Sequence, residues 1–176
     1  MIVIGLNGQF RHGKSYVAKY ILEMAEEEGL LAAVVSFATP LKELCKREFG
    51  WDGKKDEKGR RLLQVVGTDA GRGYDENIWV RKWVEHVKSL YNMDVILSDD
   101  MRFQNEVDAI EELGGTTCRV IRIEEDGRGY REPGMDKMYE HASEQPLRTA
   151  RVITCPSGDL DSLRAFSREL FRSVRG

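Results

Sequence analysis

Short apolar runs recur along the chain, and longer amphipathic stretches separate them. A continuous apolar run that ends at glycine, asparagine or charged residues is typical of a strand buried on both faces of a sheet. The sequence therefore predicts five strands, at residues 2–6, 31–37, 94–100, 116–124 and 150–155.

The stretches between these runs carry apolar residues at helical spacing. A helix from Lys14 to about Glu28 would gather one apolar face, made of Val17, Ala18, Ile21, Leu22 and Ala25. Thr39, followed by Pro40, is a good helix start. Further helices are predicted towards residue 66, from Asp75, and over residues 103–115 and 159–174, whereas the glycine-rich residues 67–74 are predicted to form a loop.

Strands that alternate with helices predict an α/β fold in which helices cover both faces of a central parallel five-stranded sheet. The 176 residues show no repeat and no linker, so we expect one domain over residues 1–176. Residues 125–142 have little periodicity and contain arginine, glycine and proline, which suggests a lid-like insert.

Composition narrows the function. The chain is 41% apolar and 32% charged, as in ordinary soluble proteins, and its net charge of −3 argues against a uniformly basic nucleic-acid surface. No apolar run reaches the roughly 18 residues of a membrane span. We expect no leader either, because the N-terminus has no basic region or cleavage site and a strand is predicted from Ile2. Three widely spaced cysteines without a CxxC pair fit a reduced, cytoplasmic protein.

The stretch "GQFRHGKS" is the most informative motif. Gly8, four residues, and then Gly13-Lys14-Ser15 match the phosphate-binding P-loop (residues 8–15), and a predicted strand precedes it and a helix follows it, as that motif requires. Its glycines let backbone N–H groups approach phosphate oxygens, and the helix N-terminus adds positive potential. Lys14 would reach the β- and γ-phosphates of ATP, and the Ser15 hydroxyl would ligate Mg²⁺.

The interior of this loop is unusual because it carries two basic residues. The simplest interpretation is that His12 faces solvent. The residues expected to border the ATP donor are Gly8, Arg11, His12, Gly13, Lys14, Ser15 and Tyr16.

A P-loop indicates only a nucleoside triphosphate, so the class of protein has to come from elsewhere. The Asn-Lys-x-Asp motif of GTPases is absent, and a motor ATPase normally needs a longer chain. A small-molecule kinase needs an acceptor pocket and a lid with arginines, and the chain has candidates for both.

The acceptor candidates follow the predicted strands, at the edge where open α/β sheets bind ligands. Phe37 and Lys42 follow the second strand, although Phe37 could be core and Lys42 solvated. Asp99, Asp100 and Arg102 follow the third strand; a carboxylate there could hold Mg²⁺ or accept a proton, and simple helix-cap chemistry explains Asp100 nearly as well.

Two further segments could contribute positive charge. The segment 67–74 offers backbone N–H groups and Arg72 for an acceptor phosphate, or is only a connection. Arg128 and Arg131 lie in the lid-like insert, where an arginine can stabilise the charge that develops in phosphoryl transfer. Surface arginines are also common in loops.

Several blocks in this order resemble the bacteriophage-type deoxynucleoside monophosphate kinases, a branch of the P-loop kinases. The resemblance runs from Ile2 to about Phe166. It rests on "GLNGQFRHGKS", "FATPLKELC", "RRLLQVVGTDAGR", "WVRKWVE", "SDDMRFQNEVDAI", "RVIRI", "HASEQPL" and "GDLDSL".

The resemblance implies a three-layer P-loop kinase fold and transfer of the ATP γ-phosphoryl group, with Mg²⁺, to a deoxynucleoside 5′-monophosphate. It also implies an acceptor region over about residues 37–80, and it makes a homodimer a candidate assembly. It favours Asp100 over Asp99 for the metal or base role, and Glu106 as a supporting group. The acceptor site would contain Phe37, Lys42, Gly67, Thr68, Arg72, Trp79, Arg102 and Glu144.

The chain departs from this pattern in two places, the Arg11-His12 pair and the "TCPSGDL" segment, which lacks a common Asn-Asp-Gly. The alternatives are a kinase for another acceptor, such as dephospho-coenzyme A or phosphomevalonate, and a catalytically silent nucleotide-binding regulator. The predicted catalytic set is Lys14, Asp100, Arg102, Arg128 and Arg131, with Ser15 and Asp100 at the metal.

Overall fold

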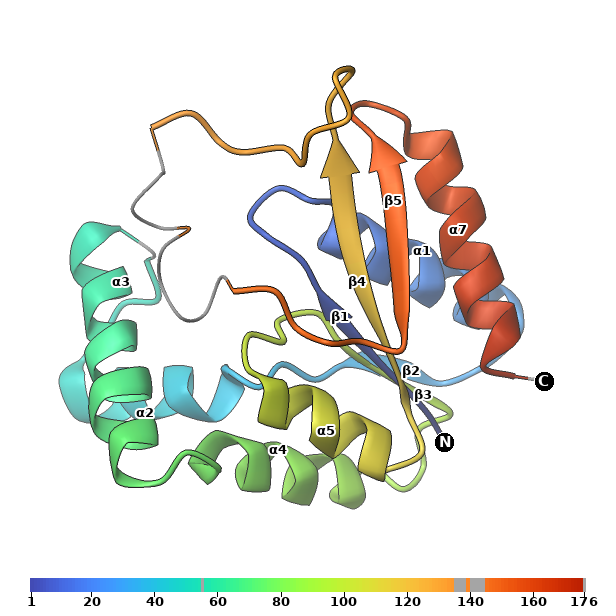
Figure 1. Ribbon diagram of the computed structural model, residues 1–176. Helices are drawn as coiled ribbons and strands as arrows, with labels where there is room; N and C mark the ends of the chain where they lie inside the picture. Colours follow the sequence, from blue (N-terminus) through green and yellow to red (C-terminus); the bar gives the residue numbers. More distant parts are fainter. Residues whose placement is uncertain (55, 135–138, 140–144, 176) are drawn as a thin grey trace.

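A parallel five-stranded sheet forms the centre of the molecule (Figure 1). The computed structural model describes residues 1–54, 56–134, 139 and 145–175. The spatial order of the strands is β2-β3-β1-β4-β5. Their bounds are β1 Ile2–Asn7, β2 Ala32–Val34, β3 Val95–Ser98, β4 Thr116–Ile123 and β5 Arg151–Pro156.

Helices lie on both faces of this sheet, which confirms the predicted three-layer α/β fold (Figure 1). β1 is central, between β3 and β4, and the chain crosses from one side of it to the other. In such sheets a crevice forms beyond the carboxyl ends of the central strands. The helices are α1 Lys14–Glu27, α2 Thr39–Phe49, α3 Glu57–Gln64, a π-helix Val65–Arg72, α4 Ile78–Ser89, α5 Gln104–Glu112 and α7 Leu160–Ser173.

Side chains alternate between the two faces of the sheet and so enter two separate cores. Ile4 and Leu6 of β1 are fully buried against α1 and α7. Val3, the residue before Ile4, packs on the opposite face of the sheet, in the cluster that contains Trp83 of α4 and Ile110 of α5. The near-continuous apolar runs of the sequence arise because both faces of each central strand need apolar cover.

A third, smaller cluster lies between α2, α3, the π-helix and α4. Leu41, Cys45 and Trp79 are buried there, beside Leu62 and Leu63. This part of the chain lies to one side of the sheet (Figure 1). It supports the segment predicted to hold the acceptor.

The prediction of a loop over residues 67–74 was wrong, because most of this segment continues α3 as a π-helix. Its glycines allow close packing. A Cβ on Gly67 would lie 2.5 Å from Leu41 Cδ2, and one on Gly71 would lie 2.9 Å from the Trp79 ring. The indole N–H of Trp79 donates to the Gly67 carbonyl at 2.8 Å, which ties this helix to α4.

Other predicted boundaries also shift. β2 covers Ala32–Val34 only, so the second strand is shorter than the apolar run that predicted it. α4 begins at Ile78 with Asn77 at its N-cap, two residues later than the predicted cap at Asp75, because the Asp75 carboxylate accepts the Asn77 N–H in a turn, at 3.0 Å. Among the described residues, no helix is both long enough and apolar enough to cross a membrane.

A substitution at Gly115 would test how tightly α5 packs on the sheet. A Cβ at this position would lie 2.7 Å from the Val3 carbonyl oxygen and 2.9 Å from that of Ile110. Both atoms are backbone, so the strand or the helix must move. We expect Gly115→Ala to lower the free energy of unfolding by about 1–3 kcal/mol in a guanidinium chloride titration.

Gly129→Ala is the matched control, because a Cβ there meets nothing within 4 Å and the backbone φ is not positive. It should unfold within about 0.5 kcal/mol of the unaltered chain. Equal unfolding midpoints for the two variants would contradict the packing described for Gly115.

Candidate active site

The P-loop connects β1 to α1 and turns its backbone towards the carboxyl edge of the sheet. Gly8 and Gly13 have φ values of 151° and 95°, which side chains rarely allow, and a Cβ on Gly8 would lie 2.5 Å from the Val120 carbonyl oxygen. No side chain caps the start of α1, and its first turn contains no acid. The N–H groups there can bind an anion.

Lys14 lies folded over this loop. Its ammonium donates to the carbonyl oxygens of Gly8 and Gln9, at 2.6 and 2.9 Å. Burial and the neighbouring Arg102 lower the pKa of Lys14 to about 8, and Asp99 and Asp100 oppose this shift. Lys14 therefore carries its charge close to both carboxylates.

The prediction that His12 faces solvent was wrong. The ring is 6% exposed, and its Nε2 donates to the Tyr130 carbonyl at 2.9 Å. Arg11 is exposed and pairs with Glu132, with 2.8 Å between Nη1 and Oε1. The two basic residues of the loop thus contact the segment after β4.

Asp99 and Asp100, directly after β3, face different partners. Asp100 accepts the backbone N–H groups of Phe37 and Ala38, at 2.9 and 3.1 Å, and so anchors the start of α2. Burial raises its pKa. Asp99 accepts only the longer bond from the Ser36 hydroxyl, at 3.4 Å, among the side-chain bonds of the described residues.

Glu106 organises the positive charge beside these acids. It is buried, pairs with Arg72, and accepts the backbone N–H groups of Arg102 and Phe103 at 2.6 and 3.1 Å. Burial raises its pKa to about 7, although the Arg72 guanidinium acts in the opposite direction. The Arg72 guanidinium also lies 3.9 Å above the centre of the Phe103 ring.

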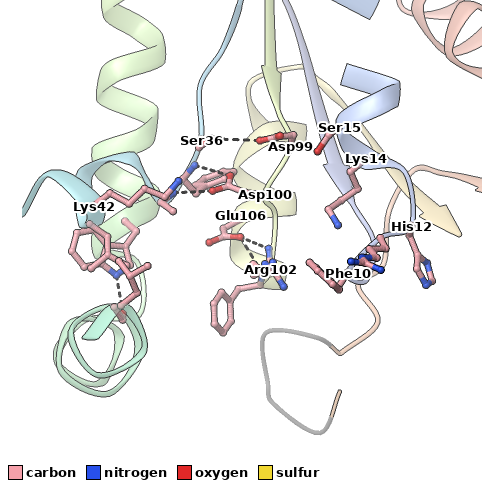
Figure 2. Close-up of a pocket in the computed structure, with 18 of the residues that line it drawn as sticks. Phe10, His12, Lys14, Ser15, Ser36, Lys42, Asp99, Asp100, Arg102 and Glu106 are labelled. Carbon is pink, nitrogen blue, oxygen red and sulfur yellow. Dashed lines mark hydrogen bonds between the residues drawn. The ribbon is translucent and has the colours of Figure 1, made fainter. Parts of the chain in front are cut away.

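These groups line one cavity of about 880 Å³. This volume lies in the upper part of the usual range for ligand sites. Figure 2 shows Lys14, Asp99 and Arg102 around the same space, with Lys42 on the opposite wall. Further predicted residues in the lining are Gly13, Ser15, Tyr16, Phe37, Gly67, Arg72 and Trp79.

Several predicted residues lie elsewhere. Thr68 is in the π-helix but does not line the cavity. Arg128 is largely exposed and pairs with Asp126, whereas the Arg131 guanidinium lies 5.2 Å from the centre of the Tyr139 ring. Neither arginine lines the cavity. Glu144, and part of the lid-like insert, lie outside the described residues.

The sequence analysis missed Arg122, which lines the cavity from the end of β4. Its Nε donates to the Ser157 hydroxyl at 2.6 Å, and its guanidinium lies 3.8 Å from the centre of the Tyr130 ring. The only available signal was an arginine near the end of an apolar strand. Ser36, Phe10 and Phe103 were missed in the same way.

The oxygen ligands in the cavity suit Mg²⁺. The Ser15 hydroxyl and the Asp99 carboxylate both line it, and Mg²⁺ prefers one or two such ligands combined with phosphate oxygens and water. In the described part of the chain, no cluster of three or more His, Cys, Asp or Glu side chains could hold a metal unaided. The donor set fits an ion that arrives with a nucleotide.

Comparison with solved structures supports the same fold. The structure of APE1195 has a TM-score of 0.54 at 15% identity and covers 99% of this chain and 96% of that chain. APS kinase CysC of Mycobacterium tuberculosis, solved with AMPPNP and APS, has a TM-score of 0.52 at 13% identity and covers 97% of both chains.

Comparison with protein sequences gives the family, although no family model matches the chain. A "Putative deoxynucleotide monophosphate kinase" of Acanthamoeba polyphaga mimivirus is 30% identical over 178 residues, which cover 86% of this chain and 84% of that protein. The deoxynucleotide monophosphate kinase of Enterobacteria phage T4 is 28% identical over 109 residues, covering 59% of this chain and 41% of its own length. The chain therefore belongs to the deoxynucleotide monophosphate kinase family and is a nucleotide-binding phosphotransferase with a P-loop kinase fold.

Proposed function

We propose that the protein transfers the γ-phosphoryl group of ATP to the 5′-phosphate of a deoxynucleoside monophosphate, giving ADP and a deoxynucleoside diphosphate. One observation carries the proposal. The P-loop and the residues predicted for the acceptor line the same cavity, from opposite sides. A donor and an acceptor phosphate could therefore meet in this cavity.

On the donor side, Lys14 would exchange its two carbonyl partners for phosphate oxygens of ATP. In the nucleotide-free protein, those bonds hold the Lys14 ammonium over the loop, beside the cavity. The N–H groups at the start of α1 would bind the same phosphates. Catalysis would come mainly from positioning and from fixed positive charge, because phosphoryl transfer needs little covalent chemistry from the protein.

Mg²⁺ would supply charge neutralisation at the phosphates, held by Ser15 and by one of the two acids after β3. The two acids differ in their hydrogen bonds: Asp100 already accepts two backbone N–H groups, whereas Asp99 accepts one long bond from a hydroxyl. The Asp99 carboxylate also raises the pKa of Lys14 more than the Asp100 carboxylate does. We therefore assign the metal to Asp99 and an anchoring role to Asp100, in contrast to the sequence prediction.

On the acceptor side, Lys42, Arg72 and Arg102 would surround the 5′-phosphate. Phe37 and Trp79 would form an aromatic wall for the base. Phe37 itself stacks on Trp83 with 4.4 Å between ring centres, so this wall is rigid. Arg128 and Arg131 would act on the transferred group only after moving, because neither lines the cavity here.

The proposal is tested by ADP formation from ATP and Mg²⁺ with a panel of acceptors. The panel contains dTMP, dGMP, dCMP, dAMP, their ribose counterparts, dephospho-coenzyme A and phosphomevalonate. We expect turnover with at least one deoxynucleotide and a loss of at least about 10³-fold in Lys14→Ala, which lacks the cation at the phosphates. Turnover of only a non-nucleotide acceptor, or ATP binding without any turnover, would reject the proposal.

Paired substitutions can distinguish the metal-binding role proposed for Asp99 from the anchoring role proposed for Asp100. Asp99→Asn should raise the Mg²⁺ concentration for half-maximal rate about tenfold or more, because it removes a charged ligand. Asp100→Asn should instead lower the unfolding temperature, since only one of its side-chain atoms can then accept an N–H bond from Phe37 or Ala38. A Mg²⁺ shift confined to Asp100→Asn would reverse the assignment.

A further inference from the structure

The two basic residues inside the P-loop hold the segment of residues 130–132. His12 donates to the Tyr130 carbonyl at 2.9 Å, and the Arg11 guanidinium contacts both carboxylate oxygens of Glu132, at 2.8 and 3.0 Å. The Tyr130 hydroxyl also bonds to Glu132. The loop is thus tied to the residue before Arg131 and to the residue after it.

The His12 contacts are specific rather than incidental. Its Nε2 donates to a carbonyl, and its Nδ1 accepts the backbone N–H of Arg122 at 3.4 Å. A neutral ring with its proton on Nε2 satisfies both partners, and burial lowers the pKa of His12, which favours that neutral form near pH 7. The ring therefore bridges the end of β4 and the segment that follows it.

The backbone at Arg11 supports a functional explanation. Its φ is 61°, and among the described residues it is the one non-glycine with a positive φ. Arginine disfavours this conformation, for which glycine would be better suited. The side chain nevertheless extends to Glu132, across 121 positions of sequence. Strain of this kind persists where surrounding contacts enforce it.

We propose that Arg11 and His12 are positioning residues, which hold residues 130–132 against the P-loop and so set where Arg131 can reach the transferred phosphoryl group. This inference rests on the proposed function. Tyr130 and Glu132 are fixed on both sides of Arg131, while the Arg131 side chain remains outside the cavity, over Tyr139. The backbone is thus placed in advance, and only the side chain has to move when ATP is bound.

The test combines kinetics with a double-mutant cycle. His12→Ala should lower kcat by about tenfold to a hundredfold, with a smaller change in KM for ATP, because misplacing a group by about 1 Å can cost that much. His12→Gln, which keeps a donor for Tyr130, should restore most of kcat. His86→Ala, on the exposed side of α4, is the histidine control and should behave like the unaltered chain.

The cycle asks whether His12 acts through Arg131. In the Arg131→Ala background, His12→Ala should change kcat by less than twofold, since the group that it positions is gone. An equal loss in both backgrounds, an unchanged kcat in His12→Ala, or an unchanged kcat in Arg131→Ala would each overturn the inference.

Arg11→Gly tests the same tie without depending on the histidine. It removes the ion pair and also relieves the strained φ, so we expect the unfolding temperature to stay equal or rise while kcat falls at least about fivefold. A lower unfolding temperature with unchanged kcat would make Arg11 a purely structural residue.

Hydrogen exchange of the nucleotide-free protein gives a readout that needs no turnover. The amides of Tyr130, Arg131, Glu132 and Gly134 should exchange faster in His12→Ala and Arg11→Gly than in His86→Ala. Unchanged exchange would refute the tie itself, whatever the enzyme does. If exchange rises as expected but the unaltered chain turns over no acceptor, the proposed function fails and the contact between loop and segment stands.

Discussion

The hydrogen bonds from Phe37 and Ala38 to the partly buried Asp100 carboxylate are the constraint on which the site depends. They join the end of β3 to the start of α2 across 62 and 63 positions of sequence. Because the P-loop follows the neighbouring strand β1, these bonds also fix α2 relative to the donor side. One carboxylate thus ties the start of α2 to the edge of the sheet at which the P-loop lies.

Around this anchor lies a cluster of charges, of which Glu106 is buried and the others are partly buried. Lys14, Arg102 and Glu106 interact electrostatically with Asp100, and Arg72 pairs with Glu106. The pKa values of Lys14 and Glu106 move to about 8 and about 7. Removing charges from water is costly, and pairing offsets only part of that cost. The cluster is better explained by function: charges held in place beforehand need not reorganise when phosphates arrive.

Sequence patterns predicted the features that arise from local chemistry. The P-loop, the five strands and the two-sided helical cover follow from spacing and apolar periodicity, and the structure confirms the three-layer fold. The segment 67–74 was predicted wrongly because its glycines suggested a loop, whereas they allow Leu41 and Trp79 to pack against a π-helix. Composition alone could not distinguish these two uses of glycine.

The remaining differences arise from contacts that are distant in sequence. His12 is buried by Tyr130, 118 positions away, and Asp100 is engaged by the start of α2, so neither environment could be seen from neighbouring residues. In the sequence Arg122 is not distinguished from other arginines on a strand, because its partner Ser157 comes from the turn after β5. A site assembled from strand ends depends on the topology that unites them.

The central claim is that donor and acceptor occupy two halves of one cavity. Calorimetric titration with a bisubstrate compound, adenosine joined to thymidine through five phosphates, tests it most directly, with the other deoxynucleosides as alternatives to thymidine. The account predicts one molecule bound per chain, more tightly than ATP, with binding suppressed by either saturating ATP or the saturating matching monophosphate. The account would be contradicted if ATP suppressed binding of the bisubstrate compound but the monophosphate still bound to the protein together with that compound.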